Sequence, residues 1–205
     1  MVELENPEVM RRVISLVSAI LERVSETNDL NGRFGPQRIS VFHGLIRPSI
    51  SIQSYLDRIF TYANCSPSCL IVAYIYLDRF SEKQPFFPIS SFNVHRLIIT
   101  SVMVSAKFMD DLFYNNAFYA KVGGISTMEM NMLEMDFLFG LGFELNVTPT
   151  TFYSYCSCIH KEIWLQHPPF LPPTSSIHNN LGPDQDLHFR TSDDEPAHRQ
   201  QQLVV

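Results

Sequence analysis

One uninterrupted apolar run most constrains how this chain can fold. The run is the stretch 93–109, NVHRLIITSVMVSAKFM, which contains neither proline nor glycine. Its apolar residues fall on nearly every face of a helix, and a helix that is apolar all round is normally buried. The run is too short to cross a bilayer, which requires about 20 apolar residues. It therefore predicts a central helix that other helices enclose.

The predicted central helix ends in charges. Lys107 lies in its last turn, and Asp110 and Asp111 follow directly. A lysine at this position interacts favourably with the negative end of the helix dipole. The dipole does not explain why a charge follows so apolar a run.

Other helices are needed to enclose the central one, and the sequence supplies them. Apolar residues recur at three- and four-residue intervals between turn-forming residues, which predicts helices at 9–24, 48–63, 67–80, 117–122, 127–139 and 151–165. The polar run 25–31 ends the first helix, and an irregular connection follows whose Phe42, Leu45 and Ile46 are expected to pack on the helices. No segment has the pattern of a strand, so the predicted fold class is all-α.

Composition divides the chain into three parts. Residues 1–31 form an N-terminal helix and turn, 32–165 a single helical domain, and 166–205 a tail rich in proline and histidine. The tail has no apolar periodicity and cannot bury enough surface to offset the entropy of ordering it. We therefore expect the tail to be disordered.

The charge balance narrows the classes of partner. Lysine and arginine number 15 and aspartate and glutamate 21, which gives a formal net charge of −6. A nucleic-acid binder usually carries a basic stripe, so no nucleic acid is expected as a partner. No membrane partner is expected either. The first ten residues lack the apolar core of a secretory signal, which favours an intracellular protein of the nucleus or cytoplasm.

No pattern in the sequence points to catalysis, a cofactor or a metal. There is no glycine-rich phosphate loop, no GxSxG and no HExxH motif. Glu129 and Glu134 stand five residues apart, which puts them on different faces of a helix. Cys156 and Cys158 are too close for the usual zinc spacing, and all four cysteines are expected to be reduced thiols. A binding module is therefore favoured over an enzyme.

Three blocks of the sequence resemble the cyclin family. YLDRF at 76–80 is similar to the end of the third cyclin-box helix, and SAKF at 105–108 with the following acids is similar to the end of the next helix. MNMLE at 130–134, running into FGLGF at 139–143, resembles the glutamate and Leu-x-Phe pattern that follows. The stretch 114–126 is similar to plant P-type or U-type cyclins and to fungal phosphate-signalling cyclins.

The resemblance implies a fold and a function. The expected fold is a single cyclin box around the central helix, with the N-terminal helix before it and one trailing helix after it. The expected function is that of a non-catalytic subunit, which binds a cyclin-dependent Ser/Thr kinase and keeps it active in cell-cycle or phosphate-signalling control. The stretch 48–52 lacks the arginine of the MRAIL block of many cyclins, so docking of Arg-x-Leu substrates is not expected.

The resemblance also implies site residues. By motif match, Lys107 and Glu134 correspond to the paired charges that contact the mobile C-helix of the kinase. Phe108 and the loop 113–119, which begins with Phe113 and Tyr114, are expected to assist them. Asp78, with its neighbour Arg79, matches an acid that is a structural anchor rather than a direct contact.

Two alternatives stay open at this point. Lys107 and Glu134 can form an internal ion pair that only joins two helices, and this role is compatible with kinase contact. The whole chain can also be a cyclin-fold scaffold or transcription-associated adaptor that activates no kinase. A helical enzyme would need a polar pocket for which the sequence gives no sign.

Overall fold

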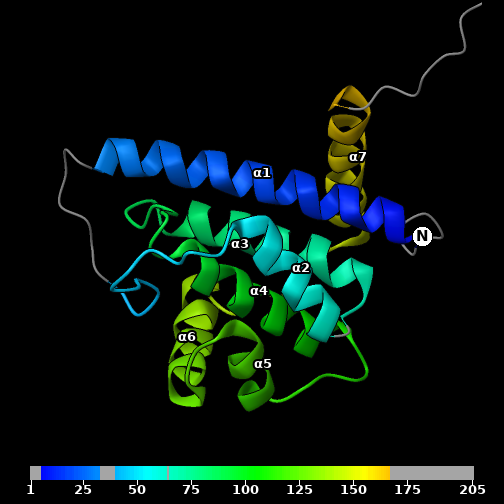
Figure 1. Cartoon of the computed structure of the whole chain (residues 1–205). Helices are drawn as coiled ribbons and strands as arrows, with labels where there is room; N and C mark the ends of the chain where they lie inside the picture. The colour runs from blue at the N-terminus through cyan, green and yellow to red at the C-terminus, as the bar shows by residue number, and fades with distance from the viewer. Residues whose placement is uncertain (1–5, 33–39, 64, 167–205) are drawn as a thin grey trace, which may run out of the picture. The chain divides into compact units, whose positions relative to one another are not determined.

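Helices dominate the part of the chain that the structure describes. The computed structural model describes residues 6–32, 40–63 and 65–166. Its helices are α1 (Pro7–Gly32), α2 (Ile52–Ala63), α3 (Pro67–Lys83), α4 (Val94–Met109), α5 (Asn116–Gly123), α6 (Thr127–Leu141) and α7 (Pro149–Gln166) (Figure 1). These residues include no strand, so the predicted all-α fold is confirmed. The predicted disordered tail, apart from Gln166, lies outside the described residues.

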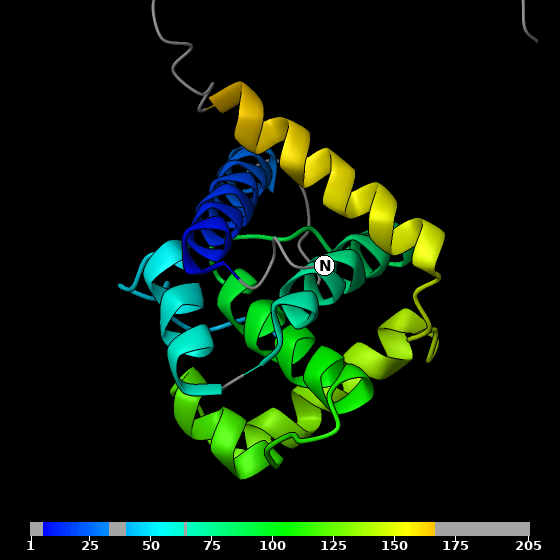
Figure 2. The ribbon, with the colours of Figure 1, turned by 90° about the vertical axis from the view of Figure 1, so that its right-hand side faces the viewer.

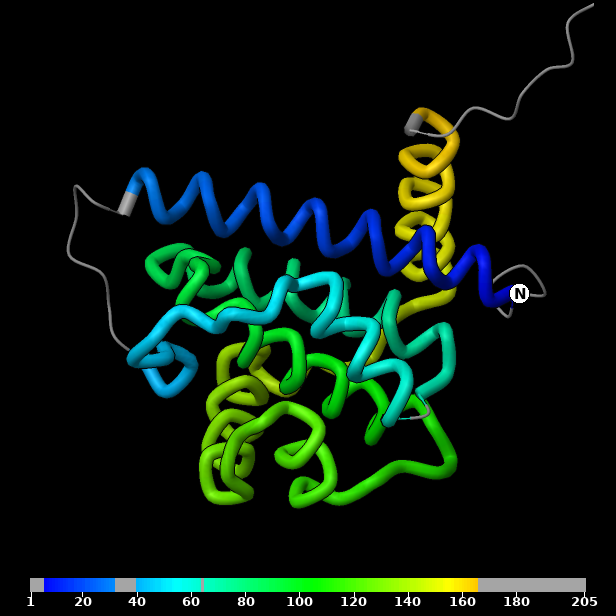
Figure 3. Tube along the Cα trace, viewed as in Figure 1, coloured from blue at the N-terminus to red at the C-terminus, as the bar shows by residue number. Residues whose placement is uncertain are grey.

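The helix predicted to lie at the centre is α4. Every residue from Leu97 to Ala106 is buried, and α4 packs against α2, α3, α5 and α6 (Figure 1, Figure 3). Its buried hydroxyl groups have partners: Ser105 Oγ donates to Val102 O at 2.9 Å and also lies 3.1 Å from Cys69 O of α3. The small side chain of Ser105 thus lets α3 approach α4 closely.

The first helix is longer than the sequence predicted. The polar run 25–31 does not end α1, which continues through it. Asn28 Nδ2 donates to Ile89 O at 2.9 Å, and the Ser91 N–H donates to Asp29 Oδ1 at 3.1 Å. These partners lie in the connection after α3, and local periodicity carries no information about them. In addition to these contacts, α1 packs against α2 and α7 (Figure 2).

The connection between α1 and α2 contributes one aromatic residue to the core. Phe42 is buried, and its ring meets the edges of three other buried rings, those of Phe80, Phe87 and Phe137. Leu45 and Ile46 are 100% and 81% exposed, so the expectation that they pack on the helices was wrong.

Capping and a salt bridge fix the position of α6. The Glu129 N–H donates to Ser126 Oγ at 3.1 Å, which is half of the capping box that the sequence Ser-Thr-Met-Glu indicates. The Glu129 carboxylate binds Arg96 of α4 instead of the Ser126 backbone, with Oε1 2.6 Å from Nη2. At the other end, Gly142 adopts a left-handed φ of 62° and stops the helix. The first turn of α6 is therefore tied to α4.

The end of α4 is tied to the start of α3 by the half-buried carboxylate of Asp110. Asp110 Oδ2 accepts from the Ser66 N–H at 3.2 Å and from the Cys69 thiol at 3.0 Å. Burial raises the pKa of Cys65 to about 11 and that of Cys69 to about 12, and the Asp110 charge adds to both shifts. These contacts hold in place the helix end that carries Lys107.

The raised thiol pKa values predict a loss of stability in alkali. An unfolded chain releases these protons near pH 9.0, whereas the folded chain holds them to about pH 11 and 12. Ionisation therefore favours the unfolded chain in that interval, and the free energy of unfolding should fall as the pH rises above about 9. Urea unfolding at several pH values measures this slope. The double variant Cys65→Ala/Cys69→Ala should show a shallower slope, and an unchanged slope would contradict the assignment.

Candidate partner-binding site

Two charges that are distant in the sequence meet at one edge of the helical domain. Lys107 lies in the last turn of α4 and Glu134 in the middle of α6, and Lys107 Nζ is 2.7 Å from Glu134 Oε1. Their side chains are 26% and 19% exposed. The internal ion pair left open by the sequence is therefore present, and both charges can still be reached from solvent.

An asparagine of α5 joins this ion pair. Asn116 Oδ1 accepts from Lys107 Nζ at 2.5 Å, while Asn116 Nδ2 donates to Glu134 Oε2 at 2.6 Å and to Asn131 Oδ1 at 2.7 Å. We call these four residues, Lys107, Asn116, Asn131 and Glu134, the charged cluster. It brings α4, α5 and α6 together through side chains alone.

Neither asparagine of the charged cluster could be singled out from the sequence. Adjacent asparagines before a short helix indicate a cap, and Asn115 does cap α5 by accepting from the Phe118 N–H at 3.0 Å. Nothing in the local pattern separates the capping Asn115 from the bridging Asn116. Only the fold, which brings the start of α5 beside the end of α4 and the middle of α6, reveals the difference.

The charged cluster can bind further groups without being broken. The Lys107 ammonium donates hydrogen bonds to Asn116 and Glu134, and it keeps another N–H that can donate to a partner. The Glu134 carboxylate uses one lone pair on each oxygen for its described partners and keeps acceptor capacity. The edge therefore offers a donor and an acceptor side by side, which suits backbone groups at the end of a partner helix.

Aromatic side chains lie on the same segment as Lys107. Phe108, Phe113 and Tyr114 are 49%, 54% and 42% exposed, on the end of α4 and the connection to α5. Tyr114 stacks on Phe118 of α5, with ring centroids 3.9 Å apart. All three aromatic residues that the sequence predicted for this site are thus accessible to a partner.

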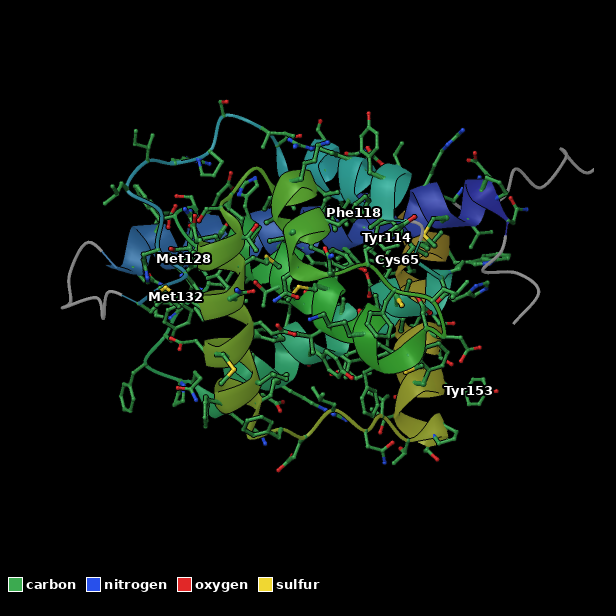
Figure 4. The ribbon with its side chains drawn as sticks, turned by 90° about the horizontal axis from the view of Figure 1, so that it is seen from below. Cys65, Tyr114, Phe118, Met128, Met132 and Tyr153 are labelled. Carbon is green, nitrogen blue, oxygen red and sulfur yellow. The ribbon has the colours of Figure 1, made fainter. Side chains whose placement is uncertain are left out.

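The outer face of α6 carries a row of exposed apolar residues that the sequence analysis assigned to a packed helix. The row consists of Met128, Met132, Met135 and Phe139, at helical spacing, and each of these is at least 51% exposed. Figure 4 shows Met128 and Met132 on α6 in the same view from below as Tyr114 and Phe118. We call this row the α6 stripe. Exposed apolar rows of this kind commonly mark an interaction surface.

Asp78 and Arg79 lie away from the charged cluster and contact the region of α7. The Tyr155 hydroxyl of α7 donates to Asp78 Oδ2. Arg79 Nη1 donates to Glu144 O at 2.9 Å and to Asn146 O at 3.0 Å in the connection between α6 and α7. These contacts join α3 to α7 and to the connection before it, and the structural-anchor role that the motif match implies for Asp78 and Arg79 stays a prediction.

Residues 6–32, 40–63 and 65–166 contain neither a metal site nor a membrane-spanning helix. No group of three His, Cys, Asp or Glu side chains there is placed to hold a metal ion. No helix in the same ranges is long and apolar enough to cross a membrane. The four cysteines are free; Cys69 is buried, Cys65 and Cys156 are half-buried, and Cys158 is exposed.

A family model and several known proteins that resemble this chain all point to the same family. The sequence model of the family described as Cyclin matches residues 11–145. The chain is 61% identical over 210 residues to Cyclin-U4-1 of Arabidopsis thaliana, covering 100% of both chains. It is 66% identical to Cyclin-U4-3 of the same plant, over 78% of this chain and 74% of the relative. It is 53% identical to Cyclin-P4-1 of Oryza sativa subsp. japonica, over 80% of this chain and 81% of the relative.

Proposed function

Because this chain belongs to the cyclin family, whose members are regulatory proteins rather than enzymes, we propose that it binds and activates a cyclin-dependent Ser/Thr kinase. The process that it serves would be cell-cycle or phosphate-signalling control. The observation that carries the proposal is the meeting of Lys107 and Glu134 at a half-buried edge, with exposed aromatic residues on the adjoining segment.

The geometry supports a contact with the C-helix of the kinase. Lys107 can donate to carbonyl groups and Glu134 can accept from N–H groups at a helix terminus, since both keep unused capacity. Phe108, Phe113 and Tyr114 would bury apolar surface around these polar contacts, and aromatic residues often dominate the energy of an interface. A polar centre with an apolar surround would fix the orientation of the bound helix.

Activation requires only a difference in affinity between two kinase states. In an active kinase, a glutamate of the C-helix pairs with the strand lysine that holds the ATP phosphates. A partner that binds the C-helix better in this arrangement shifts the kinase population toward it. The proposed contact would act on the C-helix directly, so the chain would need no catalytic group of its own.

The direct test uses the full chain and a panel of purified plant cyclin-dependent kinases. We expect at least one kinase to bind the chain and to gain about tenfold or more in phosphorylation rate, which corresponds to about 1.4 kcal/mol. Binding without any gain in rate would favour a scaffold or adaptor. Failure of every kinase to bind would overturn the proposal.

Phe108 offers a test of the aromatic part of the surface. Because it is 49% exposed, Phe108→Ala should leave the fold intact. It should weaken kinase binding by about tenfold or more, measured by calorimetry, since a truncated aromatic anchor commonly costs about 1.4 kcal/mol or more. Phe86→Ala is the matched control, because Phe86 is 86% exposed and lies in the connection between α3 and α4. Equal effects of the two substitutions would contradict the assignment of Phe108.

A further inference from the structure

Asn116 is the member of the charged cluster that forms hydrogen bonds with all three of the others. We infer that Asn116 is a positioning residue, which orients Lys107 and Glu134 toward the kinase before binding. This inference rests on the proposed function, because it concerns the same surface. It assigns to Asn116, at the start of α5, a defined role in that binding.

Both ends of the Asn116 amide have chemically matched partners. Its carbonyl oxygen faces the Lys107 ammonium, and its amide nitrogen faces the Glu134 carboxylate. The reverse orientation would set two donors against each other and two acceptors against each other. The orientation of the Asn116 amide therefore depends on which side of the ion pair is positive. If the two charges were exchanged, the amide would have to rotate so that its oxygen and nitrogen change places.

The backbone of Asn116 is fixed independently of the cluster. Asn116 is the first residue of α5, directly after the capping residue Asn115. Tyr119 and Ala120 of the same helix are 1% exposed and pack in the core. The side chain thus projects from a short but anchored helix. Rigid elements of this kind hold a binding group more accurately than a flexible loop does.

Fixing the ion pair in advance would favour association. Lysine and glutamate have long side chains that lose rotational freedom when a partner immobilises them. In the free chain, the contacts with Asn116 already restrict both side chains, while each keeps capacity for the kinase. If Asn116 instead locked the pair against the partner, its removal would strengthen binding, so the sign of the effect decides between these roles.

The test measures kinase affinity of full-length variants by calorimetry, with thermal unfolding of each variant alongside. Asn116→Ala should weaken binding about tenfold, because two side chains must then be ordered on association. Asn146→Ala is the matched control: Asn146 is exposed in the connection between α6 and α7, and its side chain makes no described contact with the charged cluster, so it should change affinity less than about twofold. In a Glu134→Gln background, Asn116→Ala should have a much smaller effect, because the two act as one unit.

A second variant keeps the test decisive if the first is poorly folded. Asn116→Asp preserves the acceptor for Lys107 but sets a carboxylate against Glu134, and two adjacent carboxylates raise the pKa of one of them. Its affinity relative to the unaltered chain should improve as the pH falls from about 7.5 to 6, which a purely structural defect would not produce.

The outcomes separate the inference from the proposed function. If the unaltered chain binds no kinase, the proposed function fails and the inference fails with it. If the unaltered chain binds but Asn116→Ala binds equally well or more tightly, the inference alone is overturned. Additive effects of Asn116→Ala and Glu134→Gln would also overturn it.

Discussion

Single charge reversals in the charged cluster are expected to abolish kinase binding while the chain stays helical. Lys107→Glu or Glu134→Lys removes a 2.7 Å ion pair and sets like charges together. Because the side chains are only 26% and 19% exposed, each reversal should lower the free energy of unfolding by about 1–3 kcal/mol. Loss of one member of such a pair at an interface costs about 2–5 kcal/mol, so kinase affinity should fall by about 30-fold or more.

The double exchange Lys107→Glu/Glu134→Lys separates the internal role of this ion pair from its role toward a partner. It restores opposite charges at the same two positions, so it should recover much of the stability that either single reversal loses. It presents reversed polarity to the kinase, so binding should remain lost. Circular dichroism and urea unfolding measure the first effect, and calorimetry with the kinase measures the second.

Asp136→Lys is the control for a simple change of net charge. Asp136 lies on the same helix, is exposed, and makes the same change of charge as Glu134→Lys. We expect it to leave kinase binding within about threefold of the unaltered chain, since isolated surface charges contribute little.

If the double exchange Lys107→Glu/Glu134→Lys bound the kinase normally, Lys107 and Glu134 would be a link between helices and not a contact surface.

The central helix could be predicted because its signal is local and strong. A helix as apolar as the run 93–109 has to be buried among other helices, and α4 is buried in this way. The starts of α3 and α6 were also predictable, since Ser66 and Ser126 lie immediately before their helices and accept the expected backbone hydrogen bonds. Such signals act over a few residues and need no knowledge of the tertiary structure.

The meeting of Lys107 and Glu134 could not be predicted from local pattern. They are separated by 27 positions in the chain, and only the motif match paired them. The role of Asn116 and the full length of α1 were missed for the same reason, because both depend on partners far away in the sequence. The α6 stripe was missed because α6 is apolar on most of its faces, so periodicity could not tell its exposed side from its buried one.

The contact between α3 and α6 depends on a residue that has no side chain. Gly140 faces Phe80, and a Cβ atom at position 140 would lie 2.2 Å from Cε2 and 2.8 Å from Cδ2 of that ring. Phe80 has little room to retreat, because it stacks on Phe137 at 5.1 Å and meets the rings of Phe42 and Phe87 edge-on. The ring therefore requires glycine at this point of α6.

Gly140→Ala is accordingly expected to destabilise the chain although alanine favours helices. The gain in helix propensity is about 1 kcal/mol at most and is smaller in a last turn. Overpacking a rigid core costs about 1–3 kcal/mol or more, and the overlap with Phe80 is severe. We expect the free energy of unfolding to fall by about 2 kcal/mol, measured by urea unfolding. In a Phe80→Leu background, which lacks most of the clashing ring, Gly140→Ala should lower the free energy of unfolding by less than it does in the unaltered chain. A stabilising Gly140→Ala would show that α6 and α3 can separate freely at this point.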